Sequence, residues 1–184
     1  MLRVIAGELR GRHLRTPPGR DTRPTSDRVR ESLFDLLGSV PDGARVLDLF
    51  AGSGALGIEA LSRGGLHAVF VERSRPALLA LRENLAALAL AGRSRVVAAD
   101  AMAAPPAAAG PFDLVLADPP YAAGLEARIV EEAVARLAPG GVLALEHTAR
   151  NAPPDPPEGL AVWKTRRYGH TSITLYVRLA EGES

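Results

Sequence analysis

Residues 46–57 read VLDLFAGSGALG, an apolar run that ends in three closely spaced glycines. The run from Arg45 to Phe50 predicts a buried strand, and the segment from Gly54 to Arg63 predicts a helix that begins within the glycine turn. The three glycines fit the pattern G-x-G-x-x-G, which lets the backbone of a strand-turn-helix unit approach a bound nucleotide closely. This stretch therefore predicts a strand-turn-helix unit that binds a nucleotide-containing ligand.

Strand and helix patterns alternate along the chain after this unit. Further helices are expected at residues 74–91 and 125–137, and further buried strands at residues 67–72, 96–99, 112–117 and 142–146. Strands separated by helices predict an α/β fold, in which a doubly wound, mostly parallel sheet is covered on both faces. The last two strands, at residues 160–165 and 172–179, have no helix between them and predict an antiparallel C-terminal hairpin.

The N-terminal part has a different pattern. Two short strands, Val4–Ala6 and Leu9–Leu14, are expected to form a β-hairpin. A loop rich in proline and arginine follows, and then a helix is expected from the N-cap Thr25 to Gly38.

The length and composition are those of one ordinary globular domain. The 184 residues are 47% hydrophobic and 23% charged, and the absence of cysteine excludes disulfide frameworks, thiol nucleophiles and iron–sulfur ligation. The four histidines have no metal-binding spacing, so no metal is expected. No apolar run reaches the roughly 18 residues of a membrane span, and no secretory signal is recognised. We therefore expect a cytoplasmic protein that does not bind membranes.

Positive charge is concentrated at the N-terminus. Residues 1–30 hold eight arginines and three acidic residues, a net charge of +5, whereas residues 31–184 carry a net charge of −4. This asymmetry is typical of a basic arm that binds a polyanion, and the alternative is a solvated charged face. If the arm binds a polyanion, the arginines expected to contact its phosphates are Arg10, Arg12, Arg20, Arg23 and Arg28, and Lys164, Arg166 and Arg167 are expected to extend this surface.

An acid follows the glycine turn at the distance expected of a ribose-binding carboxylate. Glu72 ends the second strand, twenty positions after Gly52, and can accept hydrogen bonds from both hydroxyls of an adenosine ribose. NAD and S-adenosylmethionine both contain this ribose. Asp48 favours the second, because a carboxylate beside the turn would repel a pyrophosphate but attract an ammonium or a sulfonium. An ordinary glycine-rich turn with exposed acids is the alternative.

Two other functions of a glycine-rich turn fail on single residues. A phosphate-binding P-loop needs a lysine after its last glycine, but the only lysine of the chain is Lys164. A nucleophile elbow needs a glycine two residues before and after its serine, whereas Ser53 has alanines at both positions. We therefore interpret the turn as a cofactor-binding loop.

The motif that carries the chemistry follows the fourth strand. Asp118, Pro119, Pro120 and Tyr121 lie at the carboxyl edge of the predicted sheet, beside the glycine turn. Two consecutive prolines fix the backbone and free a carbonyl, so that Asp118 and this carbonyl can both accept hydrogens from an exocyclic amine. Tyr121 can stack on a nucleobase. The alternative is an unrelated proline turn with a capping aspartate.

These residues resemble a known family, the S-adenosylmethionine-dependent Rossmann methyltransferases that modify exocyclic amines through a D/N-P-P-Y/F motif. Within this family, the chain more specifically resembles the bacterial enzymes that methylate guanine N2 in the 16S RNA of the small ribosomal subunit. Ser74 departs from the family, whose members often have a second acid or amide after the ribose-binding carboxylate. The likeness spans nearly the whole chain and is carried by RVIAG at 3–7, RGR at 10–12, RPTSDRVRESLF at 23–34, residues 48–60 and DPPY at 118–121.

The resemblance implies a seven-stranded methyltransferase sheet with an N-terminal β-hairpin added beside it. We expect a single domain over residues 1–184, with a basic hairpin and loop at 1–24 and a catalytic core at 25–184. The implied cofactor is S-adenosylmethionine, held by Asp48, Phe50, Ala51, Gly52, Ser53, Gly54, Glu72, Arg73, Asp100 and Ala101.

Each part of this implied site has its own ligand group. Asp48 and Gly52–Gly54 would face the methionine part, and Glu72 would bind the ribose. The adenine amine would meet Asp100 and Ala101, and residues 118–121 would hold the target guanine. The implied partner is ribosomal RNA or an assembling 30S particle, and we expect the protein to be a monomer.

Three other functions remain open. A DNA adenine N6 methyltransferase could use the same Asp-Pro-Pro-Tyr motif, although about 40 residues before the glycine-loop strand leave little room for a DNA-reading domain. A noncatalytic RNA-binding module with a vestigial cofactor fold is the second, and the intact Asp48, Glu72 and Asp118 count against it. The third is an NAD oxidoreductase, which cofactor binding would distinguish.

Overall fold

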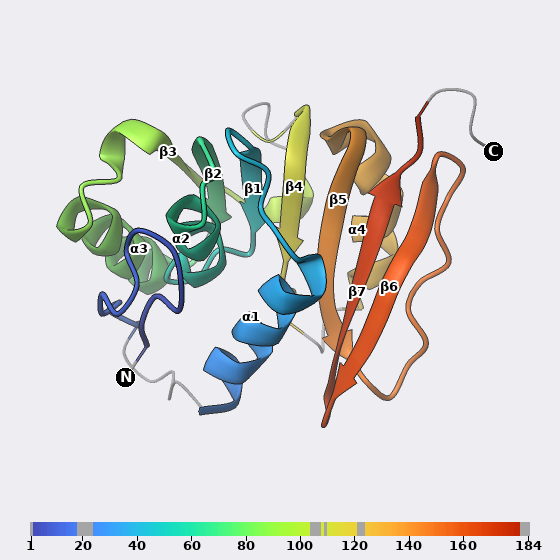
Figure 1. Cartoon of the computed structure of the whole chain (residues 1–184), viewed down its shortest axis with the longest axis horizontal. Coiled ribbons are helices and arrows are strands. Elements are labelled where there is room, and N and C mark those ends of the chain that lie inside the picture. The colour runs from blue at the N-terminus through green and yellow to red at the C-terminus, as the bar shows by residue number, and fades with distance from the viewer. Residues whose placement is uncertain (1, 18–23, 104–107, 109, 121–123, 181–184) are drawn as a thin grey trace.

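The computed structural model describes residues 2–17, 24–103, 108, 110–120 and 124–180. Within these residues, seven strands form one sheet in the order β3-β2-β1-β4-β5-β7-β6 (Figure 1). The strands are β1 (Arg45–Leu49), β2 (His67–Glu72), β3 (Ser94–Ala98), β4 (Phe112–Ala117), β5 (Leu137–Thr148), β6 (Leu160–Tyr168) and β7 (Thr171–Arg178). Strands β1 to β5 are parallel, and β7 pairs antiparallel with β5 and β6. The expected mixed sheet with its C-terminal hairpin is confirmed.

Helices cover both faces of the sheet. They are α1 (Pro24–Leu37), α2 (Ala55–Ser62), α3 (Arg75–Ala87) and α4 (Glu126–Arg136). The first three share one core, to which Phe34, Ile58 and Leu81 contribute, whereas α4 packs on the other face through Ile129 and Val130. In Figure 1, α1 lies in front of the sheet and α4 behind it. The fold is therefore doubly wound, as predicted. No helix in the described part of the chain is long and apolar enough to cross a membrane.

Alternation along β1 places one acid inside the molecule. Val46 belongs to the core under α1, α2 and α3, and Leu47 belongs to the core under α4, so Asp48 shares the face of Val46. Helix α2 lies close above this face because Gly57 has no side chain. A Cβ there would lie 2.4 Å from Phe70 Cε1 and 3.1 Å from Asp48 Oδ2. The third glycine of the pattern is thus required by the packing of helix on sheet.

The expected N-terminal strands Val4–Ala6 and Leu9–Leu14 are wrong. The described residues show no strand there, only one antiparallel bridge between Arg3 and His13. The two arms of this segment are tied by a few backbone hydrogen bonds, such as Leu14 N to Leu2 O at 2.9 Å.

The physical reason is that helix α2 takes the hydrogen bonds that a longer strand pair would need. The amides of Ile5 and Ala6 donate to the two carboxylate oxygens of Glu59 at 2.8 and 2.9 Å. Ser62 Oγ accepts from the amide of Leu9 at 2.9 Å and donates to the carbonyl of Ala6 at 2.6 Å. The N-terminal segment is therefore docked on the helix that follows the glycine loop, and it does not extend the sheet.

Several expected boundaries shift. Helix α1 begins at Pro24, so Thr25 lies within it, and α3 ends at Ala87 instead of near residue 91. Strand β5 begins at Leu137 instead of Val142, because the Pro-Gly-Gly segment continues the strand. The pairing of β4 with β5 is irregular at that point, which indicates a bulge.

Candidate active site

Three strand ends bring the predicted motifs together. In the register of the parallel strands, Leu49 of β1 pairs with Val71 of β2 on one side and with Ala117 of β4 on the other. Glu72 directly follows Val71, and Asp118 directly follows Ala117. These two acids therefore flank the start of the glycine loop. The strand order reverses between β1 and β4, and this is the position where open α/β sheets bind ligands.

The glycine loop turns sharply at this edge. Its backbone is held by hydrogen bonds from Ala51 N to Val71 O (3.0 Å) and from Gly54 N to Ala51 O (2.7 Å). Phe50 adopts a positive φ of 63°, which is strained for a residue with a side chain and costs about 1–3 kcal/mol. Gly52 and Gly54 also have positive φ, at 56° and 84°. The turn therefore depends on its glycines to leave the strand so abruptly.

Asp48 is the buried charge of the site. Asp48 is only 1% exposed, and its Oδ2 accepts a hydrogen bond from the amide of Gly57 at 2.9 Å. The pKa of Asp48 is raised to about 8, mainly by burial and also by the nearby charges of Asp118 and Glu72, while the Gly57 hydrogen bond opposes the increase. Without a ligand, Asp48 is thus mostly protonated at neutral pH. A cation beside it would favour the carboxylate.

Glu72 folds its carboxylate back over the loop. Oε2 accepts from the amide of Gly52 at 2.7 Å, and Oε1 accepts from the amides of Arg73 and Ser74 at 2.9 and 2.7 Å. The backbone of Ser74, which departs from the family pattern, therefore helps to orient the acid that precedes it. In the described residues, no group of three or more histidine or acidic side chains is placed to hold a metal ion.

The predicted adenine-binding residues lie beside Glu72. Strand β3 pairs with β2 so that Ala98 is opposite Glu72, and Asp100 follows two residues later. Asp100 accepts a hydrogen bond from the amide of Met102 at 2.8 Å and forms an ion pair with Arg73 at 2.8 Å. The Met102 hydrogen bond and the Arg73 guanidinium hold the pKa of Asp100 below its ordinary value. Arg73 therefore orients Asp100, while the neighbouring Ala101 is buried.

The Asp-Pro-Pro motif starts at the end of β4. Asp118 is exposed, Pro119 is buried and Pro120 is exposed. Because the charge of Asp118 contributes to the raised pKa of Asp48, the two carboxyl groups are near neighbours. Tyr121, the last residue of the motif, lies outside the described residues. The structure thus brings the glycine loop, Asp48, Glu72 and the Asp-Pro-Pro part of the motif to one edge of the sheet.

The predicted phosphate-binding residues lie on separate elements. Arg10 and Arg12 are exposed on the N-terminal segment, and Arg28 is exposed on α1. Arg12 also donates to the carbonyl of Ala87 at 3.0 Å, at the end of α3. Arg20 and Arg23 lie outside the described residues.

On the other edge of the sheet, β6 carries the remaining three cations. Lys164 donates to the carbonyl of Leu36 at 2.9 Å and thereby satisfies the C-terminal end of α1. Arg166 and Arg167 are exposed, and Arg167 donates to the carbonyl of Gly169. Lys164 therefore has a structural role that the charge pattern did not predict.

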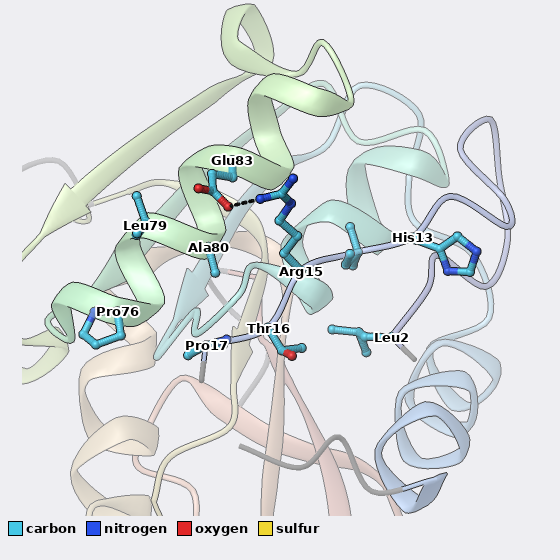
Figure 2. A pocket seen from close by; sticks show the side chains of 10 residues that line it. Leu2, His13, Arg15, Thr16, Pro17, Pro76, Leu79, Ala80 and Glu83 are labelled. Carbon is cyan, nitrogen blue, oxygen red and sulfur yellow. Dashed lines mark hydrogen bonds and ion pairs between the residues drawn. The ribbon is translucent and has the colours of Figure 1, made fainter. Parts of the chain in front are cut away.

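A hollow of about 580 Å³ lies between the N-terminal segment and α3. Figure 2 shows its walls, with Pro76, Leu79 and Glu83 on α3 facing Arg15 and Pro17 of the N-terminal segment. The ion pair between Arg15 and Glu83 crosses its rim at 3.0 Å. None of the residues predicted to bind cofactor lines it, so this hollow is distinct from the site at the strand ends.

Asn84 is a residue that the sequence analysis missed. It is 2% exposed, and its side chain donates to the carbonyls of Ser53 and Arg15 at 2.9 and 3.0 Å and accepts from the amide of Arg15 at 2.7 Å. One amide thus joins the glycine loop to the N-terminal segment. No local pattern distinguishes this asparagine from an ordinary helical one, so only the tertiary contacts reveal it.

Replacing Asn84 by leucine should lower the free energy of unfolding by about 1–3 kcal/mol, because backbone groups of Ser53 and Arg15 would lose their partner in a partly buried position. Urea denaturation measures the effect. Glu83→Gln is the matched control, since it disrupts only the exposed ion pair with Arg15 and should cost less than about 1 kcal/mol. Equal losses in the two variants would contradict the role of Asn84.

A doubly wound sheet with this strand order, a glycine loop after β1 and an acceptor motif after β4 defines a Rossmann-like methyltransferase. The chain belongs to the family described as "Conserved hypothetical protein 95", which it matches over residues 2–177.

Named relatives support this assignment. The chain is 40% identical over 189 residues to "Ribosomal RNA small subunit methyltransferase D" of Escherichia coli strain K12, which covers 100% of this chain and 93% of that protein. It is also 40% identical over 181 residues to "Putative rRNA methyltransferase YlbH" of Bacillus subtilis, with 95% and 98% covered. The solved structure "Putative methyltransferase yhhF from Escherichia coli" matches with a TM-score of 0.85 and 37% identity, over 98% of this chain and 99% of that one. The family resemblance predicted from the motifs is confirmed.

Proposed function

We propose that this protein transfers a methyl group from S-adenosylmethionine to the exocyclic N2 of a guanine in small-subunit ribosomal RNA. The observation that carries the proposal is the position of Asp118 and Pro119 at the strand-order reversal, next to Asp48 and the glycine loop. The names of the relatives support ribosomal RNA as the substrate class. We propose free 16S RNA or an assembling 30S particle as the partner of a monomeric enzyme.

The residues around the glycine loop fit S-adenosylmethionine. Asp48 is buried with a raised pKa, so a ligand that places a positive charge beside it recovers the favourable energy of an ion pair. S-adenosylmethionine carries two such charges, the ammonium and the sulfonium, and when bound it supplies a methyl group activated by the sulfonium. Glu72 would accept hydrogen bonds from the ribose hydroxyls, and Asp100 with Ala101 would meet the adenine amine.

The chain's own residues would then prepare the guanine. The lone pair of guanine N2 is delocalised into the ring, so the amine is a poor nucleophile. Asp118 and the carbonyl of Pro119 can accept its two hydrogens and so localise the lone pair on nitrogen. Tyr121 would stack on a base swung out of its RNA context and hold the nitrogen in line with the methyl group.

Transfer is complete when the amine loses a proton. The nitrogen lone pair forms the new N–C bond, and the electrons of the broken C–S bond remain on sulfur. The amine, which is now positively charged, releases its proton to Asp118 or to water. The same carboxylate stabilises the positive charge that passes from sulfur to nitrogen.

One assay distinguishes this function from its alternatives. Protein is incubated with methyl-labelled S-adenosylmethionine and, in separate reactions, 16S RNA, 30S particles or DNA. Label on guanine N2 is the expected result. Label on adenine N6 of DNA would instead establish the DNA methyltransferase, and no label in any substrate would favour a noncatalytic RNA-binding module.

The N-terminal arginines should make RNA binding strongly salt-dependent. Replacing Arg10 and Arg12 together by alanine is expected to flatten the slope of log affinity against log salt by about 2 at most, because each phosphate contact contributes about one counterion. Fluorescence anisotropy with labelled 16S RNA fragments measures the slope. The control is Arg45→Ala with Arg95→Ala, which removes the same charge from two exposed positions on β1 and β3, outside the N-terminal segment. An unchanged slope in the Arg10 and Arg12 variant would identify a solvated surface.

A further inference from the structure

One acid beside Asp118 has no role in the mechanism above. Strand β5 lies next to β4, and their parallel register pairs Ala117 with Leu145. Asp118 directly follows Ala117, and Glu146 directly follows Leu145. Neighbouring strands are about 4.8 Å apart, so Glu146 begins one strand spacing away from Asp118.

Both acids are placed on the same face of the sheet. Leu116 pairs with Ala144, and both belong to the core under α1, α2 and α3. Alternation assigns the residues two positions further on, Asp118 and Glu146, to this face. Glu146 also pairs with Ile173 of β7, which belongs to the same core. It is half-buried, at the end of the site away from the glycine loop.

Two neighbouring carboxylates, Asp118 and Glu146, favour a substrate that has hydrogen-bond donors. Carboxylates on adjacent strands repel each other, and they would also repel the phosphates of RNA. The Watson–Crick edge of guanine offers donors at two neighbouring positions, the N2 amine and N1–H. Adenine has only an acceptor at N1. Asp118 and Pro119 already account for the amine, which leaves N1–H without an acceptor.

We propose that Glu146 accepts a hydrogen bond from N1–H of the target guanine and thereby makes the site specific for guanine over adenine. The inference rests on the proposed function and names the residue that sets its base specificity. An enzyme that reads a flipped base does so through this edge. A carboxylate facing the N1 acceptor of adenine would instead be repelled.

Arg166 lies on the same face of the sheet as Asp118 and Glu146, in line with them across the strands. Ile173 pairs with Arg166 of β6, so the row runs from Asp118 through Glu146 and Ile173 to Arg166. Lys164, two residues before Arg166, contacts α1, which places the two cations on the α1 face. Asp118 and Glu146 therefore lie where the target base would bind. The exposed Arg166 lies two strands away from Glu146, where a flanking phosphate of the RNA can bind.

The test combines a variant with a base analogue. The guanine that the wild-type enzyme labels is mapped first, and it is then replaced by 2-aminopurine in an RNA assembled by ligation. 2-Aminopurine keeps the amine but has an acceptor at N1. Glu146→Ala should lower kcat/KM on guanine RNA about 10- to 100-fold, the equivalent of one hydrogen bond to a charged group. On 2-aminopurine RNA, Glu146→Ala should react at least as fast as wild type, because the variant lacks the carboxylate that the N1 acceptor would repel. Glu146→Gln, which keeps an acceptor, should recover part of the activity on guanine.

The control is Glu131→Ala, which removes an exposed carboxylate from α4, on the opposite face of the sheet. It should leave the preference for guanine over 2-aminopurine unchanged. If Glu146→Ala lowers kcat/KM on the guanine RNA and on the 2-aminopurine RNA by the same factor, Glu146 has only a structural role and the inference is wrong. If the wild-type enzyme labels no guanine N2 in any RNA, the proposed function itself fails, which is a different result.

Discussion

Asp118→Ala should reduce the rate of methyl transfer by about 10²- to 10⁴-fold, the range expected when a positioned acid–base group is removed. Cofactor affinity should remain nearly the same. The side chain of Asp118 is exposed at the end of β4. In the proposed mechanism it acts on the amine of the substrate and not on the cofactor. Without it, one of the two acceptors that localise the N2 lone pair is lost.

Single-turnover transfer at saturating cofactor measures this effect directly. Asp118→Asn keeps an acceptor oxygen and should be less impaired than Asp118→Ala. Asp113→Ala is the matched control, because Asp113 belongs to the same strand but accepts from the amide of Arg45 at the opposite edge, at 2.7 Å. An Asp118→Ala enzyme that transfers at the wild-type rate would rule out this mechanism.

The parts of the fold that were predictable are those in which local pattern and tertiary packing agree. The strand before the glycine loop, the loop and α2 follow from apolar periodicity and from the need for glycine in a tight turn. The end of each strand then positions Glu72 and Asp118 without further information, because parallel strands share one carboxyl edge. Glu72 and Asp118 therefore lie at the same edge of the sheet as the glycine loop.

The parts that were not predictable depend on a partner far away in the chain. The N-terminal strands fail to form because the buried Glu59 takes the amides of Ile5 and Ala6, more than 50 residues earlier. Likewise, Lys164 is partly used at the end of α1 instead of being available to RNA. Periodicity and local charge carry no information on such contacts.

Cofactor binding should strengthen as the pH rises from 6 to 8, because Asp48 must lose its proton to pair with the ammonium and sulfonium. Its pKa in the ligand-free protein is raised to about 8, so below this pH each binding event also has to remove a proton. The expected gain approaches tenfold in affinity per pH unit and ends near pH 8. In Asp48→Asn, binding should be weaker and should not follow this dependence.

Two measurements separate Asp48 from the amino group of the ligand, which titrates in a nearby range. Calorimetry in buffers of different ionisation enthalpy should count about one proton released per S-adenosylmethionine bound at pH 7 in wild type and none in Asp48→Asn.

The second measurement is the stability of the ligand-free protein. Because the folded pKa lies above the ordinary value of 3.8, the protonated Asp48 stabilises the fold at low pH, and this contribution is lost as the pH rises from about 4 through 8. Urea denaturation should therefore show wild type losing stability relative to Asp48→Asn over that interval. Parallel curves for the two proteins would mean that Asp48 is already ionised without the cofactor, and the gain in affinity with pH would then have to disappear as well.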